Sequence, residues 1–136
     1  MKIWYGHGSE HSANLVMIGH FEEARNAAEA KEAIDRLTEQ VRADQAEGLI
    51  EIGGHTERYG DRMLKLLQEV RFHDVRPYEL EQFAYDFSVE LEQSEVVIKT
   101  EESDVSAFLK LLVDKGARVE VYSAHSHPDS PHGRGK

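Results

Sequence analysis

The histidines are the residues of this chain with the most specific chemistry. Eight occur among 136 residues, and four of them form two close pairs, His7 with His11 and His125 with His127. Imidazole nitrogens are ligands for zinc, nickel and copper. If the two pairs meet in the fold, four imidazoles, or three together with Glu10, predict a site for one of these metals in a binding protein or a metal-dependent enzyme. The alternative is that they are unrelated loop and tail histidines.

A glycine-rich segment contains the first histidine pair; residues 6–12 read GHGSEHS. Glycine lets a backbone approach a ligand closely, and successive N–H groups with the hydroxyl of Ser9 can cradle an anion. The segment is not a P-loop, because it lacks the lysine and leads into an expected strand instead of a helix. The alternative is that serine and glycine serve here only as turn residues.

A second loop, residues 53–60, carries groups that suit an anion. The guanidinium of Arg58 can bind a carboxylate or a phosphate through two hydrogen bonds, with Tyr59 beside it. On an expected strand, His20 could add general acid–base chemistry. The alternatives are surface charge balance for Arg58 and a packed, hydrogen-bonded role for His20. The predicted small-anion sensor comprises Ser9, Glu10, His20, Arg58 and Tyr59.

The acidic residues are the second informative feature. The chain has 26 Asp and Glu against 16 Lys and Arg, which gives a formal net charge of −10. Residues 77–104 hold nine of the acids and a single base, Lys99. An acidic surface of this kind suits a basic protein partner, such as a nuclease-like toxin or another subunit. The alternative is a solvated face that keeps a small protein in solution. The predicted docking residues are Glu79, Glu90, Glu92 and Glu95.

The composition also excludes several classes of protein. No cysteine is present, which rules out a disulfide scaffold, a thiol nucleophile, an iron–sulfur cluster and a Cys-type zinc finger. Nucleic acid is disfavoured as a partner, because phosphate is bound by Lys and Arg clusters. No signal peptide or membrane-spanning stretch is recognised, so a cytoplasmic protein without membrane contact is expected. Ser9, Glu10 and His11 are adjacent and cannot form a catalytic triad, so we expect a non-catalytic protein.

Hydrophobic periodicity predicts the elements that position these residues. The expected strands are residues 1–5, 15–21, 49–52, 89–92, 96–99 and 118–123. The expected helices are residues 26–47, 61–70, 77–87 and 103–115. Residues 15–21 are apolar on both faces and should lie in the middle of a sheet. The first helix should begin at Asn26, with Glu29 completing a capping box, and should end at Gly48.

These elements form two strand–helix–strand units, residues 15–52 and 89–122, with a helical pair inserted between them. The order resembles the ferredoxin-like α+β sandwich over about two-thirds of the chain. The resemblance implies an antiparallel sheet in which the first strand of the first unit lies beside the last strand of the second. Both histidine pairs would then converge at one end of the sheet. We expect one α+β domain over residues 1–123, with an extra N-terminal strand, and a mobile tail rich in His, Pro and Gly over residues 124–136.

A fold of this class does not determine a function. The expected function is a small acidic binding module that engages a basic protein partner, in the manner of an immunity protein, an antitoxin or a regulatory subunit. Homodimerisation through the sheet is a further option. A transition-metal protein and a small-anion sensor are the alternatives that the sequence leaves open, and it does not select between zinc, nickel and copper.

Overall fold

In the part of the chain that the structure describes, the fold has four strands, three α-helices and one 3₁₀ helix. A computed structural model describes residues 14–50, 58–102 and 104–123. In chain order the elements are β1 (Leu15–His20), α1 (Ala24–Ala46), α2 (Asp61–Val70), η1 (Pro77–Ala84), β2 (Phe87–Glu92), β3 (Glu95–Thr100), α3 (Ser106–Asp114) and β4 (Arg118–Ser123).

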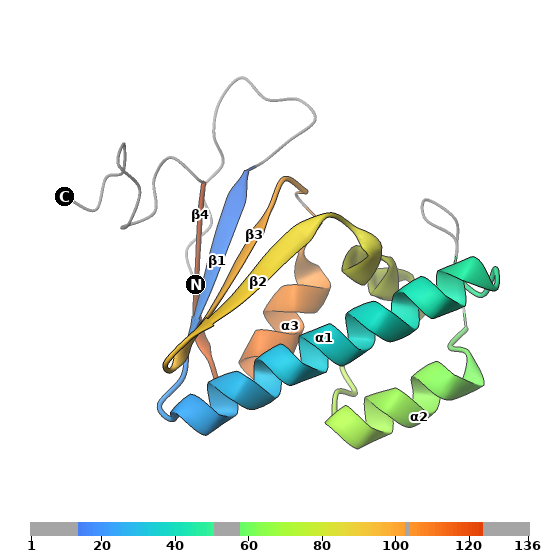
Figure 1. Ribbon diagram of the computed structural model, residues 1–136, viewed down its shortest axis with the longest axis horizontal. Coiled ribbons are helices and arrows are strands. Elements are labelled where there is room, and N and C mark those ends of the chain that lie inside the picture. Colours follow the sequence, from blue (N-terminus) through green and yellow to red (C-terminus); the bar gives the residue numbers. More distant parts are fainter. Residues whose placement is uncertain (1–13, 51–57, 103, 124–136) are drawn as a thin grey trace.

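The strands form one antiparallel sheet in the order β2-β3-β1-β4. As Figure 1 shows, α1 and α3 lie on one side of this sheet, and α2 lies beside α1. The main hydrophobic core fills the space between the helices and the sheet. The protein is therefore an α+β structure with one helical layer and one sheet layer.

The middle position of β1 confirms the expectation drawn from its apolar residues. Leu15 and Met17 belong to the main core on the helical side. Val16 and Ile18 face the other way and form a second, smaller cluster with Val97. Successive side chains of a strand point to opposite faces, so a strand that is apolar on both faces is buried on both.

The long helix α1 buries the stripe that the sequence predicts. Ala27, Ile34 and Leu37 are fully buried along it. Its start differs from the prediction, because the helix begins at Ala24, and Glu23 is the N-cap residue without a side-chain capping bond. Asn26 therefore lies inside the first turn, and the expected capping box is wrong. Gly48 follows the helix with a φ of 78°, the left-handed conformation that favours glycine.

Two other expectations are corrected. Leu49 and Ile50 form a bend and not the beginning of a strand; residues 51–52 lie outside the described part of the chain. The strand that follows α1 in the sheet is therefore β2, which the chain reaches only after α2 and η1. The helix beginning at Pro77 is a 3₁₀ helix that ends at Ala84. The expected strand at residues 1–5 and the tail at residues 124–136 also lie outside the described residues.

In the ranges that the structure describes, no helix is both long and apolar enough to cross a bilayer.

Candidate functional site

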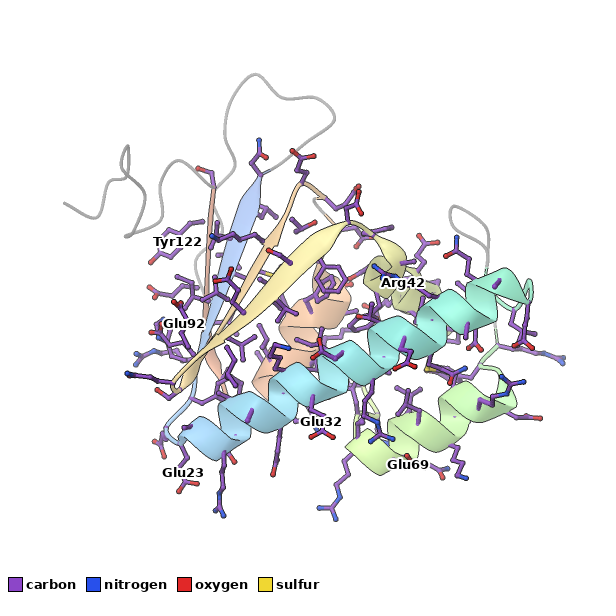
Figure 2. The ribbon with its side chains drawn as sticks, viewed as in Figure 1. Glu23, Glu32, Arg42, Glu69, Glu92 and Tyr122 are labelled. Atoms are coloured by element: carbon purple, nitrogen blue, oxygen red, sulfur yellow. The ribbon has the colours of Figure 1, made fainter. Side chains whose placement is uncertain are left out.

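The site is built on the outer face of the sheet, which is the face turned away from the helices. Register and strand alternation place twelve side chains there. They are Ser88, Glu90 and Glu92 of β2, Glu95, Val97 and Lys99 of β3, Val16, Ile18 and His20 of β1, and Arg118, Glu120 and Tyr122 of β4. Figure 2 shows Glu92 and Tyr122 on the side of the sheet opposite the helices.

The pairing register divides this outer face into an apolar end and a charged end. Val16 lies opposite Tyr122, and both belong to the smaller hydrophobic cluster. Four residues further along β1, His20 lies opposite Glu95 on one side and Arg118 on the other. The charged end is therefore the end at which β1 finishes and the β2–β3 hairpin turns.

His20 is held between two carboxylates from the neighbouring strands. Its Nδ1 lies 2.8 Å from Oε2 of Glu95, and its Nε2 lies 3.0 Å from Oε1 of Glu120. A carboxylate only accepts hydrogen bonds, and a neutral imidazole has one N–H. Both contacts are therefore hydrogen bonds only when the ring is an imidazolium. The side chains of His20, Glu95 and Glu120 are 26%, 40% and 30% exposed, so the cluster is open to a ligand or partner.

Tyr122 extends this cluster along β4. Its hydroxyl donates to Oε2 of Glu120 over 2.6 Å. The hydrogen bond to that carboxylate, followed by burial, raises the pKa of Tyr122 to about 12. Glu120 therefore accepts from Tyr122, contacts the imidazole of His20, and connects the two ends of the outer face.

Three of the predicted docking residues meet on this surface. Glu92 and Glu95 are direct cross-strand partners at the hairpin, and Glu90 lies two residues before Glu92 on the same face. Like charges placed directly opposite each other are destabilising. Glu95 lies against the imidazole of His20, whereas Glu92 is exposed at the edge of the sheet. The charged end therefore keeps an acidic excess.

The prediction for Glu79 is wrong, because this residue is only 3% exposed and no docking partner can reach it. Its carboxylate accepts from Ser106 Oγ at 2.6 Å, Lys110 Nζ at 2.9 Å and the backbone N–H of Arg76 at 2.9 Å. Burial alone would raise the pKa of Glu79, but these three hydrogen bonds outweigh it, and the pKa lies below its ordinary value. Glu79 therefore joins η1 to α3.

Gln82 continues the same buried network. Its Nε2 donates to Asp104 Oδ1 at 2.9 Å and to Ser106 Oγ at 3.0 Å. Its Oε1 accepts from the backbone N–H of Ala107 at 2.7 Å, in the first turn of α3. Every polar atom of the Gln82 side chain is thus bonded, which is typical of a structural network.

The residues predicted for a small-anion site do not come together. Tyr59 packs against the main core and its hydroxyl donates to the backbone carbonyl of Val75, on the helical side of the sheet. His20 lies on the outer face between two carboxylates, which would repel an anion. Arg58 is exposed. Ser9 and Glu10 lie outside the described residues.

The four histidines of the predicted metal site, His7, His11, His125 and His127, also lie outside the described residues. Among the residues that the structure does describe, no group of three or more His, Asp or Glu side chains could hold a metal ion. The register does match the strand arrangement on which the metal prediction depends. Leu15, at the start of β1, pairs with Ser123, at the end of β4.

Sequence reasoning missed Glu120 and Tyr122 as members of the site. A signal was present, because both alternate with the buried Val119 and Val121 on a strand that was predicted with the correct limits. The sequence does not reveal the pairing register, which places Arg118 opposite His20 and brings Glu120 within reach of the imidazole.

No curated protein and no solved structure matches the chain. A family model described as a family of unknown function, DUF6375, matches residues 1–134. Since this match spans nearly the whole chain, the protein belongs to the family of unknown function DUF6375.

Proposed function

We propose that the protein is a non-catalytic module that binds a basic protein partner through the charged end of the outer face. One observation carries the proposal. The register gathers Glu92 and Glu95 at that end, in one row with His20 and Arg118, and places Glu90 and Glu120 in the adjacent row. These acids come from three strands, so the sheet presents them as one surface.

The exposure of these carboxylates suits association and not catalysis. Glu90 and Glu92 are exposed, and Glu95 is partly exposed. Charges at the rim of an interface steer a partner of opposite sign and set specificity more than they add affinity. The net charge of −10 adds a long-range attraction for a basic protein.

We further infer that the architecture is ferredoxin-like. Support comes from the element order, with α2 and η1 inserted before β2, and from the strand order β2-β3-β1-β4. In such a sheet the helices cover one face and the other is available to a partner. The analogy supports the use of the outer face and does not identify the partner.

Charge reversal tests the proposal. The variant Glu90→Lys with Glu92→Lys should lose a basic partner that wild-type protein captures by cross-linking in cell extract and that mass spectrometry identifies. The matched control is Glu29→Lys with Glu32→Lys, which makes the same change of charge at exposed positions of α1. The control should keep the partner. Equal capture by both variants, or a captured partner that is acidic, would refute the proposal.

We propose a transition-metal site as the second candidate function, on the strength of the Leu15–Ser123 pair. The histidines at positions 7, 11, 125 and 127 are the ligand set, and zinc, nickel or copper is the metal. Native mass spectrometry with elemental analysis of tag-free protein should then find near-stoichiometric metal that is lost in His7→Ala and in His127→Ala. The control His73→Ala changes an exposed histidine that is not in the ligand set, and this variant should retain the metal. Metal-free wild-type protein would eliminate this candidate.

A further inference from the structure

The strand β2 is the most exposed strand that the structure describes. It is at an edge of the sheet and, within the described residues, pairs with β3 alone. Its residues alternate between half-buried and exposed and are all exposed from Glu90 to Glu92, whereas five of the six residues of β1 are buried. A free strand edge presents a row of backbone donors and acceptors that can pair with another chain.

The hairpin geometry determines which backbone groups of β2 face outward. Gln93 and Ser94 form a two-residue turn between β2 and β3, and Glu92 pairs with Glu95 across it. The pair that closes such a turn is hydrogen-bonded, and hydrogen-bonded and non-hydrogen-bonded pairs alternate along an antiparallel ladder. The backbone groups of Glu90 therefore face β3, while those of Val89 and Leu91 are directed away from the sheet.

The side chains of β2 define the chemistry of a strand that could pair there. Glu90 and Glu92 point to the outer face. Val89 and Leu91 point to the helical side, where Val89 packs against the core and Leu91 is 40% exposed. Cross-strand neighbours on one face interact directly, and opposite charges stabilise such a pair. The complementary strand thus alternates cationic residues facing Glu90 and Glu92 with apolar residues beside Leu91.

A second copy of the same strand does not meet this requirement. In a two-fold antiparallel pairing centred on Glu90, that residue faces its own copy. In a pairing centred on Leu91, Glu90 faces Glu92 of the other copy. In a pairing centred on Val89, Glu92 faces Asp86 of the other copy. Each register places acids opposite each other, and like charges at such positions are destabilising. The charges of this edge therefore oppose self-pairing and favour a basic strand.

We propose that β2 accepts an extended basic segment of the partner as a fifth strand, with Lys or Arg facing Glu90 and Glu92 and apolar residues covering Leu91. The inference rests on the proposed function and names the mode of binding. Main-chain hydrogen bonds at Val89 and Leu91 supply affinity, and the alternating side chains supply specificity.

Two peptides of identical composition test the mode of binding. The probe is acetyl-Arg-Val-Arg-Val-Arg-Val-amide, and its control is acetyl-Arg-Arg-Arg-Val-Val-Val-amide, which has the same charge without alternation. We expect the alternating peptide to bind about ten-fold more tightly by calorimetry, because only it can place every arginine on one face. Amide hydrogen exchange should slow at Val89 and Leu91 when that peptide is bound.

Variants of β2 separate the main-chain contribution from the charge contribution. Leu91→Pro removes an outward N–H that does not serve the pairing with β3, and it should abolish binding of the alternating peptide. Leu91→Ala keeps the N–H and should retain most of the affinity. Glu90→Gln with Glu92→Gln should weaken binding about ten-fold, whereas Glu29→Gln with Glu32→Gln should leave it unchanged. If Leu91→Pro fails to fold, hydrogen exchange in the wild-type complex decides.

The outcomes distinguish this inference from the function on which it rests. Equal affinity for the two peptides with unchanged exchange at Val89 and Leu91 would overturn strand addition, while leaving a charged docking surface in place. Pairing of β2 with a second copy, seen as a dimer that shows the same slowed exchange without peptide, would also overturn it. Failure of the proposed function itself would appear in the capture experiment, as equal capture by the charge-reversed and control proteins.

Discussion

At the hairpin end of the outer face, Glu95 has a carboxylate on one side and an imidazole on the other. Glu92 is its direct cross-strand partner, and His20 Nδ1 lies 2.8 Å from its Oε2. A like-charge pair at directly opposite positions of two strands opposes folding. Residues that weaken the fold in this way are candidates for a role in binding.

Glu92→Lys turns the like-charge pair with Glu95 into an opposite-charge pair. We expect the free energy of unfolding to rise by about 0.5–1 kcal/mol in urea denaturation. The same variant should weaken capture of the basic partner, because it reverses a charge of the proposed surface. Glu29→Lys on α1 serves as the control for net charge. A variant that is less stable than wild type would contradict this account of the Glu92–Glu95 pair.

The tyrosine hydroxyls provide a second measurement at the residue scale. Hydrogen bonding to Glu120 raises the pKa of Tyr122 to about 12, and burial beside Glu81 raises the pKa of Tyr85 to about 12. Ultraviolet titration should therefore find two tyrosines that ionise near pH 12, and Tyr122→Phe should remove one of them. Because the folded value lies above the ordinary value of 10.0, their contribution to stability is complete below pH 10 and is lost between pH 10 and 12. Ionisation of both near pH 10 would show that these bonds are absent in solution.

At the scale of elements, η1 and α3 are held together by a buried polar network and by packing. Phe83 and Phe108 place their ring centroids 5.0 Å apart, and Phe87 approaches Phe108 at 4.8 Å. Glu79 bonds to Ser106 and Lys110 across the same contact. The first turn of α3 therefore depends on side chains that come from η1.

Glu79→Ala tests this dependence. Removing one partner of a buried pair leaves the other groups unsatisfied, and we expect a loss of about 3 kcal/mol in unfolding free energy. Glu101→Ala, at an exposed position, should change it by less than about 0.5 kcal/mol. The pKa of Glu79 is lowered in the fold, so its stabilisation is present above the ordinary carboxyl pKa and is lost as the pH falls through the lowered value. A Glu79→Ala protein as stable as the control would show that packing alone joins η1 to α3.

The end of α2 offers a stabilising change. Arg71 has a φ of 58° and follows the helix in a Schellman arrangement, with the N–H of Phe72 donating to the carbonyl of Leu67. A non-glycine residue in this conformation costs about 1–2 kcal/mol. Arg71→Gly should therefore raise the free energy of unfolding by about 1 kcal/mol. Gly48→Ala, at a φ of 78°, is the converse change and should lower the free energy of unfolding. Thermal or urea denaturation of both variants measures the two changes.

At the scale of the whole molecule, the sheet separates two environments. Helices cover one face, and the other carries the smaller apolar cluster at one end and the acidic residues at the other. The net charge of −10 surrounds both faces with a negative potential. Such a field accelerates the approach of a cationic partner and is screened by salt over about 10 Å at 0.1 M.

Salt should therefore act on association more than on dissociation. Between about 0.05 and 0.5 M sodium chloride, we expect the association rate constant for the captured partner to fall at least ten-fold, with a smaller change in the dissociation rate constant. Surface plasmon resonance with purified partner measures both constants. An association rate that does not depend on salt would argue against an electrostatic docking surface.

The sequence by itself determined the elements whose signals are local. The apolar residues of β1, the stripe of α1, and the limits of β4 follow from side-chain periodicity within a single segment, which depends only on neighbours along the chain. The acidic character of β2 and of the hairpin is likewise visible in the sequence. The order of pairing between the first and last strands was anticipated through the resemblance in element order.

Only the tertiary structure decided which charged residues meet. Glu79 and Glu90 belong to one acidic run, yet the first is buried by Ser106 and Lys110 of α3 and the second is exposed on β2. In the same way, the contacts of His20 come from β3 and β4, both distant in sequence. Burial and ion pairing depend on groups brought together by packing, and periodicity within a segment carries no information about those groups.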